Sequence, residues 1–159
     1  MILSFVFVFS FAVSAQNLTA LDGGKVDVQG HEGKVVVLAI GASWLPLSKD
    51  QAAFTNKIAK KFVGRDVVVY FVATDSVSEK SKNFASNDEI GIFATRNKLT
   101  VPILRDSDGL LTLKKYNIDQ LPSFVILGKD GKQATESFIG IDPKSDISVP
   151  ISQAIDKLL

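Results

Sequence analysis

Few side chains in this sequence could act as nucleophiles or bases. The chain contains no cysteine and a single histidine, His31. Ser48 follows an apolar run and a short turn, and a serine nucleophile there would need a base to take its proton. His31 lies in a glycine-flanked turn. We therefore expect His31 to be solvated, Ser48 to bond within its own helix, and the two to form no catalytic pair. Ser43 is expected to bond local backbone.

Metal chemistry also has little support in the sequence. Zinc-binding spacing of cysteine and histidine is absent. The run Asp106–Gly109 is similar to the start of a calcium loop, but no glutamate follows at the required distance, so we interpret it as a turn. Asp75, after an apolar run, is the one carboxylate that could do chemistry, and its alternative role is a helix or loop cap. We expect no catalytic residue, no metal ligand and no cofactor.

The residues around Ser48 predict a strand followed by a helix. Residues Lys34–Ile40 form an apolar, β-branched run, which is typical of a buried strand. Apolar residues then recur every four positions as far as Phe62, which predicts a helix from about Pro46. Asp50 near its start and lysines near its end suit the helix dipole. The intervening segment, Ala42–Ser48, is therefore a strand-to-helix turn.

The remaining patterns predict an α/β domain. Further strands are expected at 25–28, 67–73, 101–105, 121–127 and 133–139, and further helices at 87–97, 110–116 and 147–159. The buried strands on either side of the first helix indicate a right-handed βαβ unit. Pro102 donates no ladder hydrogen bond, so its strand is expected at a sheet edge. Lys129–Gly131 predicts a hairpin turn.

Three motifs in this order resemble the thioredoxin fold, and more closely its exported TlpA/ResA-like branch of redoxins of the AhpC/TSA type. They are Ala42-Ser43-Trp44 followed by Pro46, the segment Tyr116–Ile126 with Pro122, and Asp130-Gly131. The resemblance covers roughly residues 26–159. It implies a three-layer sandwich, with a central mixed sheet flanked by helices, the TlpA-type insert, and a cis peptide bond before Pro122.

The chain departs from this family at the two positions that carry its chemistry. Relatives have cysteines where this sequence has Leu45 and Ser48. Disulfide exchange requires a thiolate, so neither exchange nor peroxidase activity can be carried over. Gly41 replaces an aromatic residue of the relatives, which indicates that the packing behind the turn is rebuilt.

The resemblance also implies a groove where the residue before the cis proline pairs its backbone with an extended segment. The groove residues would be Trp44, Leu45, Pro46, Leu47, Ser48, Leu121 and Pro122. One hypothesis is a non-redox module that binds an extended or apolar protein segment. A second is a protein of oxidoreductase ancestry that docks a redox partner without performing exchange. The site could also be a relic, with Leu45 and Leu47 packed inward, or the chain a structural subunit.

The N-terminus predicts a signal peptide over residues 1–15, followed by one domain over 16–159. Residues 2–13 are almost wholly apolar, and Val13-Ser14-Ala15 is typical of a signal-peptidase site. The run is too short to span a bilayer. An N-terminal strand is the alternative, because phenylalanines alternate along it. We expect a periplasmic or secreted protein with no membrane span after signal removal.

Charge points to no polyanionic partner. The chain has 18 basic and 17 acidic residues, for a net charge of +1. A balanced charge gives no electrostatic reason to expect binding to nucleic acid or to an anionic membrane.

Overall fold

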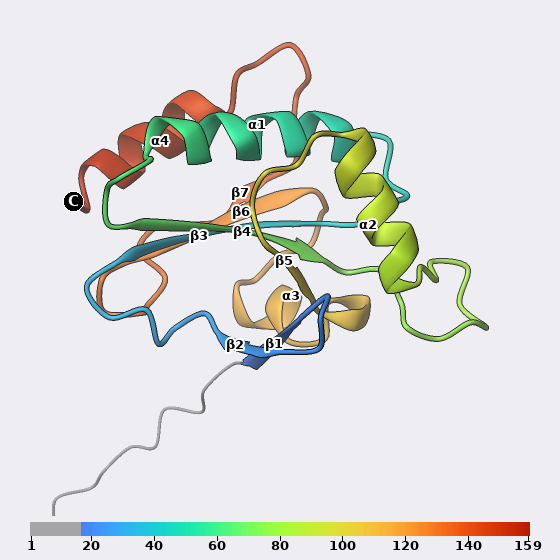
Figure 1. Ribbon diagram of the computed structural model, residues 1–159. Coiled ribbons are helices and arrows are strands. Elements are labelled where there is room, and N and C mark those ends of the chain that lie inside the picture. The colour runs from blue at the N-terminus through green and yellow to red at the C-terminus, as the bar shows by residue number, and fades with distance from the viewer. Residues whose placement is uncertain (1–16) are drawn as a thin grey trace, which may run out of the picture.

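The long apolar runs form the centre of a mixed β-sheet that lies between layers of helices (Figure 1). The computed structural model describes residues 17–159, so the predicted signal peptide lies outside the described residues. The elements are β1 (Asn17–Ala20), β2 (Lys25–Asp27), β3 (Val35–Gly41), α1 (Ser48–Lys61), β4 (Val67–Ala73), α2 (Asn87–Arg96), β5 (Ile103–Arg105), the 3₁₀ helix η1 (Ser107–Gly109), α3 (Thr112–Lys115), β6 (Ser123–Leu127), β7 (Phe138–Ile139) and α4 (Ser148–Asp156). The three-layer α/β architecture predicted from the sequence is confirmed.

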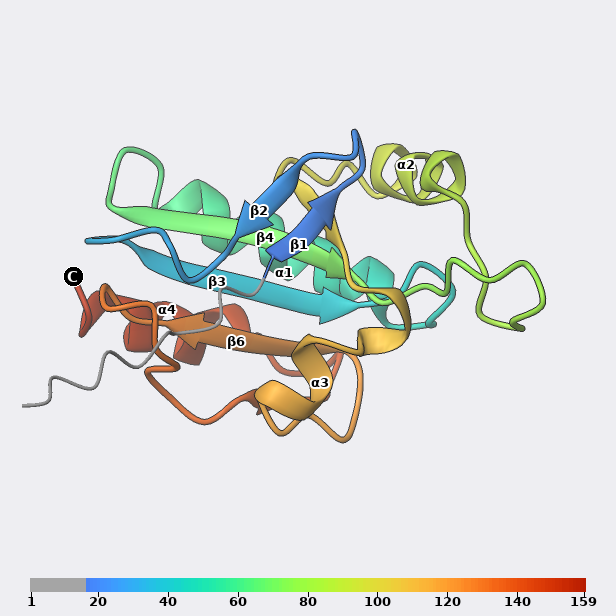
Figure 2. The same ribbon diagram turned by 90° about the horizontal axis from the view of Figure 1, so that it is seen from below.

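Within residues 17–159, the sheet has seven strands in the order β2-β1-β5-β4-β3-β6-β7. β3 and β4 run parallel, with α1 as the crossover between them, as the βαβ pattern predicted. β6 runs antiparallel to β3, and its first residue, Ser123, pairs with Ile40 near the end of β3. The end of β3 and the start of β6 therefore lie side by side at one end of the sheet (Figure 2).

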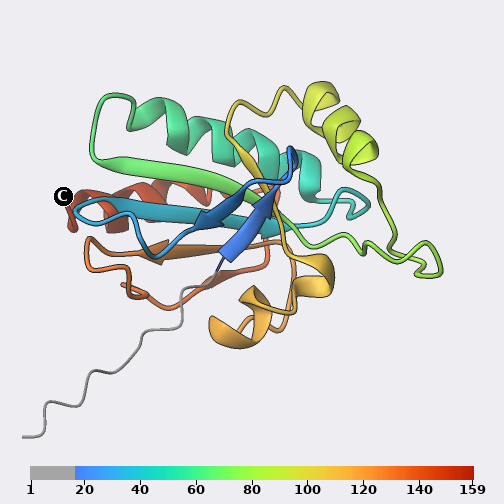
Figure 3. The ribbon, with the colours of Figure 1, turned by 60° about the horizontal axis from the view of Figure 1, so that its bottom comes forward.

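The two faces of the sheet carry separate hydrophobic clusters. One face packs against α1, α2 and α4, through residues such as Ile58, Ile90 and Ile151. The other face packs against α3 and the loops around it, through Leu113, Tyr116 and Ile118. Because side chains alternate along a strand, the central strands are buried on both sides. All seven residues of β3 are buried. Figure 3 shows α3 on the face opposite α1.

Two expectations about strands need correction. The strand after Pro102 was expected at an edge, but β5 lies inside the sheet between β1 and β4. Pro102 precedes the strand, and its carbonyl accepts a hydrogen bond from the N–H of Phe71 at 3.1 Å. The N–H that proline lacks is therefore not needed for a hydrogen bond between β5 and its neighbours. A further strand, β1, was not predicted from the sequence, and it pairs with both β2 and β5. This strand is short and only Leu18 is fully buried, so it carries little periodic signal.

The predicted hairpin after β6 forms, but its second strand is interrupted. The carbonyl of Lys132 accepts a bond from the N–H of Gly128, which closes the turn, and Gly131 has a positive φ of 73°. Gln133 bridges Leu127, and regular pairing resumes only in β7. The N–H of Ala134 still donates to the carbonyl of Ile126 at 2.9 Å, and residues 135–137 form a bulge between this contact and β7. A bulged, two-residue edge strand is a poor template for unintended pairing with another chain.

Candidate functional site

The turn between β3 and α1 keeps the geometry of a helix start. The N–H of Ser48 donates to the carbonyl of Leu45 at 3.1 Å, and the N–H of Gln51 donates to that of Leu47 at 3.0 Å. Leu45 and Ser48, the positions of the cysteines in the family that the sequence resembles, therefore occupy one tight turn. Leu45 is half-buried, whereas Ser48 is fully buried.

A buried carboxylate holds this turn in place. The N–H of Ser43 donates to both carboxylate oxygens of Asp75, at 3.1 and 3.0 Å, and its hydroxyl donates to Oδ1 at 2.5 Å. Asp75 follows β4 and is fully buried. Ser43 was expected to bond local backbone, and this expectation was wrong, because its partner is the side chain of Asp75. For Asp75, the geometry matches the predicted alternative of a loop cap.

The described residues include no activated nucleophile at this turn. The Ser48 hydroxyl donates to the carbonyl of Ala42 at 2.5 Å, rather than bonding within its helix as expected. His31 is not the solvated residue that was expected. It is half-buried, and its Nε2 lies 3.0 Å from the hydroxyl of Tyr70. His31 precedes β3 and Ser48 follows it, so the length of the strand separates the two side chains.

The loop that faces the turn carries a cis proline. The Leu121–Pro122 peptide bond is cis, and β6 begins at the next residue. The Nε2 amide of Gln51 donates to the carbonyls of Ile40 and Ser123, at 3.0 and 3.1 Å. One buried side chain of α1 therefore joins the end of β3 to the start of β6.

Between the turn and the loop lies a hollow of about 360 Å³, which we call the Trp44 hollow. Its lining consists of Trp44, Leu45, Leu113, Ile118, Asp119, Gln120 and Leu121. Trp44 is 50% exposed, so half of a large aromatic side chain is open to solvent. Exposed aromatic and aliphatic surface of this kind often marks a contact site.

The hollow contains three of the seven predicted groove residues, namely Trp44, Leu45 and Leu121. Pro46 is exposed but lies outside the lining, and Leu47 packs against the core beneath α1. Ser48 and Pro122 are buried, so neither presents surface to a partner. The other four lining residues were not predicted. They come from α3 and the residues just before Leu121, and their place within or near the Tyr116–Ile126 motif was the available signal.

The backbone at Leu121 is the other notable feature of this hollow. Within the described part of the chain, neither its N–H nor its carbonyl makes a hydrogen bond. Leu121 is half-buried, and unpaired backbone groups there favour a partner that supplies the missing bonds. The arrangement has the chemistry of a short strand edge.

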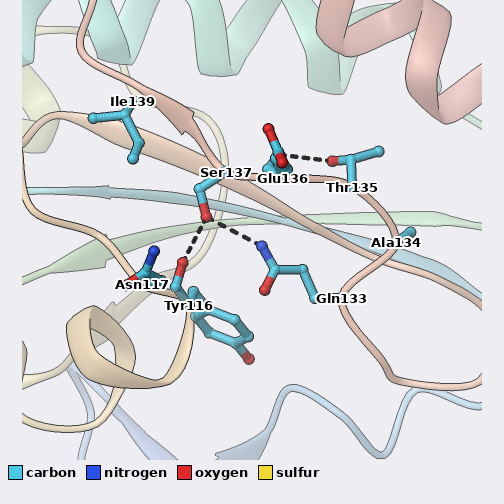
Figure 4. A pocket seen from close by; sticks show the side chains of 8 residues that line it. All are labelled: Tyr116, Asn117, Gln133, Ala134, Thr135, Glu136, Ser137 and Ile139. Carbon is cyan, nitrogen blue, oxygen red and sulfur yellow. Dashed lines mark hydrogen bonds between the residues drawn. The ribbon is translucent and has the colours of Figure 1, made fainter.

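A larger hollow of about 630 Å³ lies beside the bulge before β7 (Figure 4). Two hydrogen bonds join polar groups of its lining, since Ser137 Oγ donates to the carbonyl of Tyr116 at 2.9 Å and Gln133 Nε2 donates to Ser137 Oγ at 3.1 Å. Burial, with a smaller contribution from the Asp27 carboxylate, raises the pKa of Tyr116 to about 12, so this phenol is neutral at physiological pH.

Among residues 17–159, no cluster of three or more histidine or acidic side chains could hold a metal ion.

Comparison with known sequences finds thiol–disulfide oxidoreductases among the relatives of this chain. It is 24% identical over 119 residues to the thiol-disulfide oxidoreductase ResA of Bacillus thuringiensis subsp. konkukian (strain 97-27), and that match covers 75% of this chain and 63% of the relative. It is also 24% identical to ResA of Bacillus anthracis over 130 residues, which cover 82% of this chain and 69% of the relative. The chain thus spans about 63% of the length of the first relative.

Solved structures share the fold. The pneumococcal exposed lipoprotein thioredoxin Etrx1 aligns with a TM-score of 0.69 and 26% identity, over 91% of this chain and 100% of that one. A secreted Mycobacterium tuberculosis disulfide oxidoreductase homologous to Escherichia coli DsbE aligns with a TM-score of 0.68 and 22% identity, over 91% and 96%. The predicted thioredoxin-like fold is therefore confirmed. Residues 11–134 match the sequence model of the AhpC/TSA family.

Proposed function

We propose, from the premise that this chain belongs to the AhpC/TSA family, that it is a non-redox member which binds an extended protein segment in the Trp44 hollow. The family membership supplies a thioredoxin-like scaffold related to thiol–disulfide oxidoreductases. The sequence supplies no cysteine with which to perform their reaction. A thiol–disulfide oxidoreductase must bind its substrate before it exchanges thiols, and binding does not require cysteine.

The observation that carries the proposal is the combination of an apolar hollow with an unpaired backbone at its rim. The N–H and carbonyl of Leu121 would bond the backbone of an extended segment, as in strand addition. Leu45, Leu113 and Ile118 would cover one of its side chains. Because successive side chains of a strand point to opposite sides, the next residue would face away from the hollow.

Trp44 gives a direct test, because it is the only tryptophan of the chain. A short capped peptide of alternating valine and threonine should change the emission of Trp44 in a saturable titration. Leu121→Asp should abolish the response, because a carboxylate placed in the apolar lining resists desolvation. Val63→Asp is the matched control, since Val63 is 79% exposed and does not line the hollow. Saturable binding that survives Leu121→Asp would mean that the groove is not the site.

The second candidate is docking of a redox partner whose own cysteines perform the exchange. It is favoured by the retained turn geometry at Leu45 and Ser48 and by the thiol–disulfide oxidoreductases among the relatives. A disulfide-containing partner peptide and its alanine-substituted counterpart separate the candidates. Equal affinity supports segment binding, and a strong preference for the disulfide supports redox docking.

Export is part of the same proposal. The apolar residues 2–13 and the small residues at 13–15 support a cleaved signal peptide. Two of the structures it resembles are described as secreted or exposed. No helix among the described residues is long and apolar enough to cross a membrane. N-terminal sequencing of the protein from the exported fraction should begin at Gln16, and a chain that retains Met1 in the cytoplasm would contradict export.

A further inference from the structure

Among the described residues that line the Trp44 hollow, Asp119 is the only charged one. It is exposed, and no described residue forms an ion pair or hydrogen bond with its carboxylate. The three ion pairs of the described chain all involve α1, α4 and their flanking loops. The hollow therefore presents one uncompensated negative charge beside apolar surface.

Trp44 is a second group in this hollow that favours a positively charged ligand. The face of an indole ring attracts cations, and tryptophan does so more strongly than tyrosine or phenylalanine. Trp44 is 50% exposed and lines the same hollow as Asp119. The remaining lining is mostly aliphatic and suits the methylene stem of a long basic side chain, whose charged end stays near water.

We infer that the hollow receives an arginine side chain of the bound segment, an inference that rests on the proposed function. The methylene stem of the arginine lies against Leu45 and Leu113, and its guanidinium reaches Asp119 and Trp44. Arginine fits better than lysine because its planar guanidinium pairs with both oxygens of a carboxylate, stacks on aromatic rings and is weakly hydrated.

The hollow beside the bulge provides a contrast within the same molecule. It also contains one carboxylate, that of Glu136, but no tryptophan and only a few aliphatic groups (Figure 4). Its lining also includes the polar side chains of Gln133, Thr135 and Ser137. A negative charge alone therefore does not distinguish the Trp44 hollow from the hollow beside the bulge. The Trp44 hollow differs because it combines the carboxylate with an indole ring and an aliphatic lining.

Three capped peptides of alternating valine and threonine, with arginine, citrulline or norleucine at the central position, test the inference. Citrulline keeps the shape of arginine without its charge. Binding is measured by anisotropy of a fluorescent label on the peptide, so that the readout does not depend on Trp44. Exposed ion pairs contribute up to about 1 kcal/mol, so the arginine peptide should bind about fivefold more tightly than the citrulline peptide.

In Asp119→Asn the ratio of the affinities for the arginine and citrulline peptides should fall close to one, whereas Glu136→Gln should keep the ratio of the unchanged protein. The preference should also shrink as sodium chloride screens the carboxylate. Equal binding of all three peptides to the unchanged protein, or an arginine preference that persists in Asp119→Asn, would overturn the inference and leave the proposed function standing. Failure of every peptide to bind would overturn both.

Discussion

The side chain of Gln51 occupies the space that a side chain at position 41 would need. A Cβ atom added to Gly41 would lie 2.1 Å from Gln51 Oε1 and 3.1 Å from Cδ. Gln51 cannot easily move aside, because its amide is held by the carbonyls of Ile40 and Ser123. Gln51 therefore fills the space beside Gly41 in this chain. That the packing differs here from the relatives stays a prediction.

Gly41→Ala should therefore destabilise the protein by about 1–3 kcal/mol, the usual cost of overpacking a filled core. Urea unfolding monitored by circular dichroism measures the change. Gly91→Ala is the matched control, because an added Cβ there meets no atom within 4 Å and the residue lies in α2. That variant should gain up to about 1 kcal/mol from helix propensity.

The clash can be isolated with a double-mutant cycle. Gly41→Ala should cost less in a Gln51→Ala background than in the wild-type protein, with a coupling energy of about 0.5–3 kcal/mol. Additive effects of the two substitutions would show that Gln51 is not what excludes a side chain from position 41.

Restoring the two sulfurs tests whether the scaffold can still perform exchange. Leu45→Cys with Ser48→Cys should reduce the disulfides of insulin in the presence of dithiothreitol, because a thiol at a helix N-terminus has a lowered pKa. Position 45 is half-buried and position 48 is fully buried, so the thiol introduced at position 45 should attack and the thiol at position 48 should resolve the mixed disulfide. Leu45→Cys alone should form stable mixed disulfides without turnover.

Leu45→Ala with Ser48→Ala controls for the loss of the original side chains. Inactivity of a folded double-cysteine variant whose two thiols both titrate would indicate that the site is remodelled beyond the sulfurs.

Arg105 connects the segment between β4 and β5, which contains α2, to the sheet. Its Nη2 donates to the carbonyls of Asp75, Ser76 and Ala85, and its Nη1 donates to Asn87 Oδ1 at 2.7 Å. Arg105→Met should destabilise the protein by roughly 2 kcal/mol or more, because hydrogen bonds from a charged group contribute about 1.5–3 kcal/mol. Thermal unfolding measures the loss.

Arg96→Met, on the exposed part of α2, is the control and should be nearly neutral. Equal effects of the two substitutions would argue against a structural role for the Arg105 contacts.

Two ion pairs between α1 and the α4 region should make stability depend on pH in the acid range. The Lys57 ammonium, helped by the Ser148 hydroxyl, lowers the pKa of Asp146, and the Lys61 ammonium lowers the pKa of Asp156. A lowered pKa in the folded state stabilises the protein at pH values above the ordinary Asp pKa of about 3.9, and this contribution is lost as the pH falls through the lowered value.

Asp146→Asn with Asp156→Asn should therefore lower the melting temperature at pH 7 and have progressively less effect below about pH 4. Thermal melts across this range, at low salt, measure the difference. A deficit that stays constant down to the most acid pH would mean that the two carboxylates act through something other than their charge.

The sequence by itself determined the layers of this protein and the loss of its sulfur chemistry. Long apolar runs such as Val67–Ala73 predict buried strands, because a strand covered on both faces has no side that needs polar residues. The chain has no cysteine, and folding cannot supply the thiolate that disulfide exchange requires. The motifs around Trp44 and Pro122 were enough to predict that the turn and the loop meet.

Only the tertiary structure decided which residues open onto the hollow. Local patterns do not show that Ser48 turns inward to Ala42, or that Asp119 and Leu113 come to line the same surface as Trp44. They likewise left β5 misplaced at an edge, because the strand that covers its far side, β1, is distant in sequence. Burial and pairing of this kind depend on contacts between distant segments, and periodicity within one segment carries no information about them.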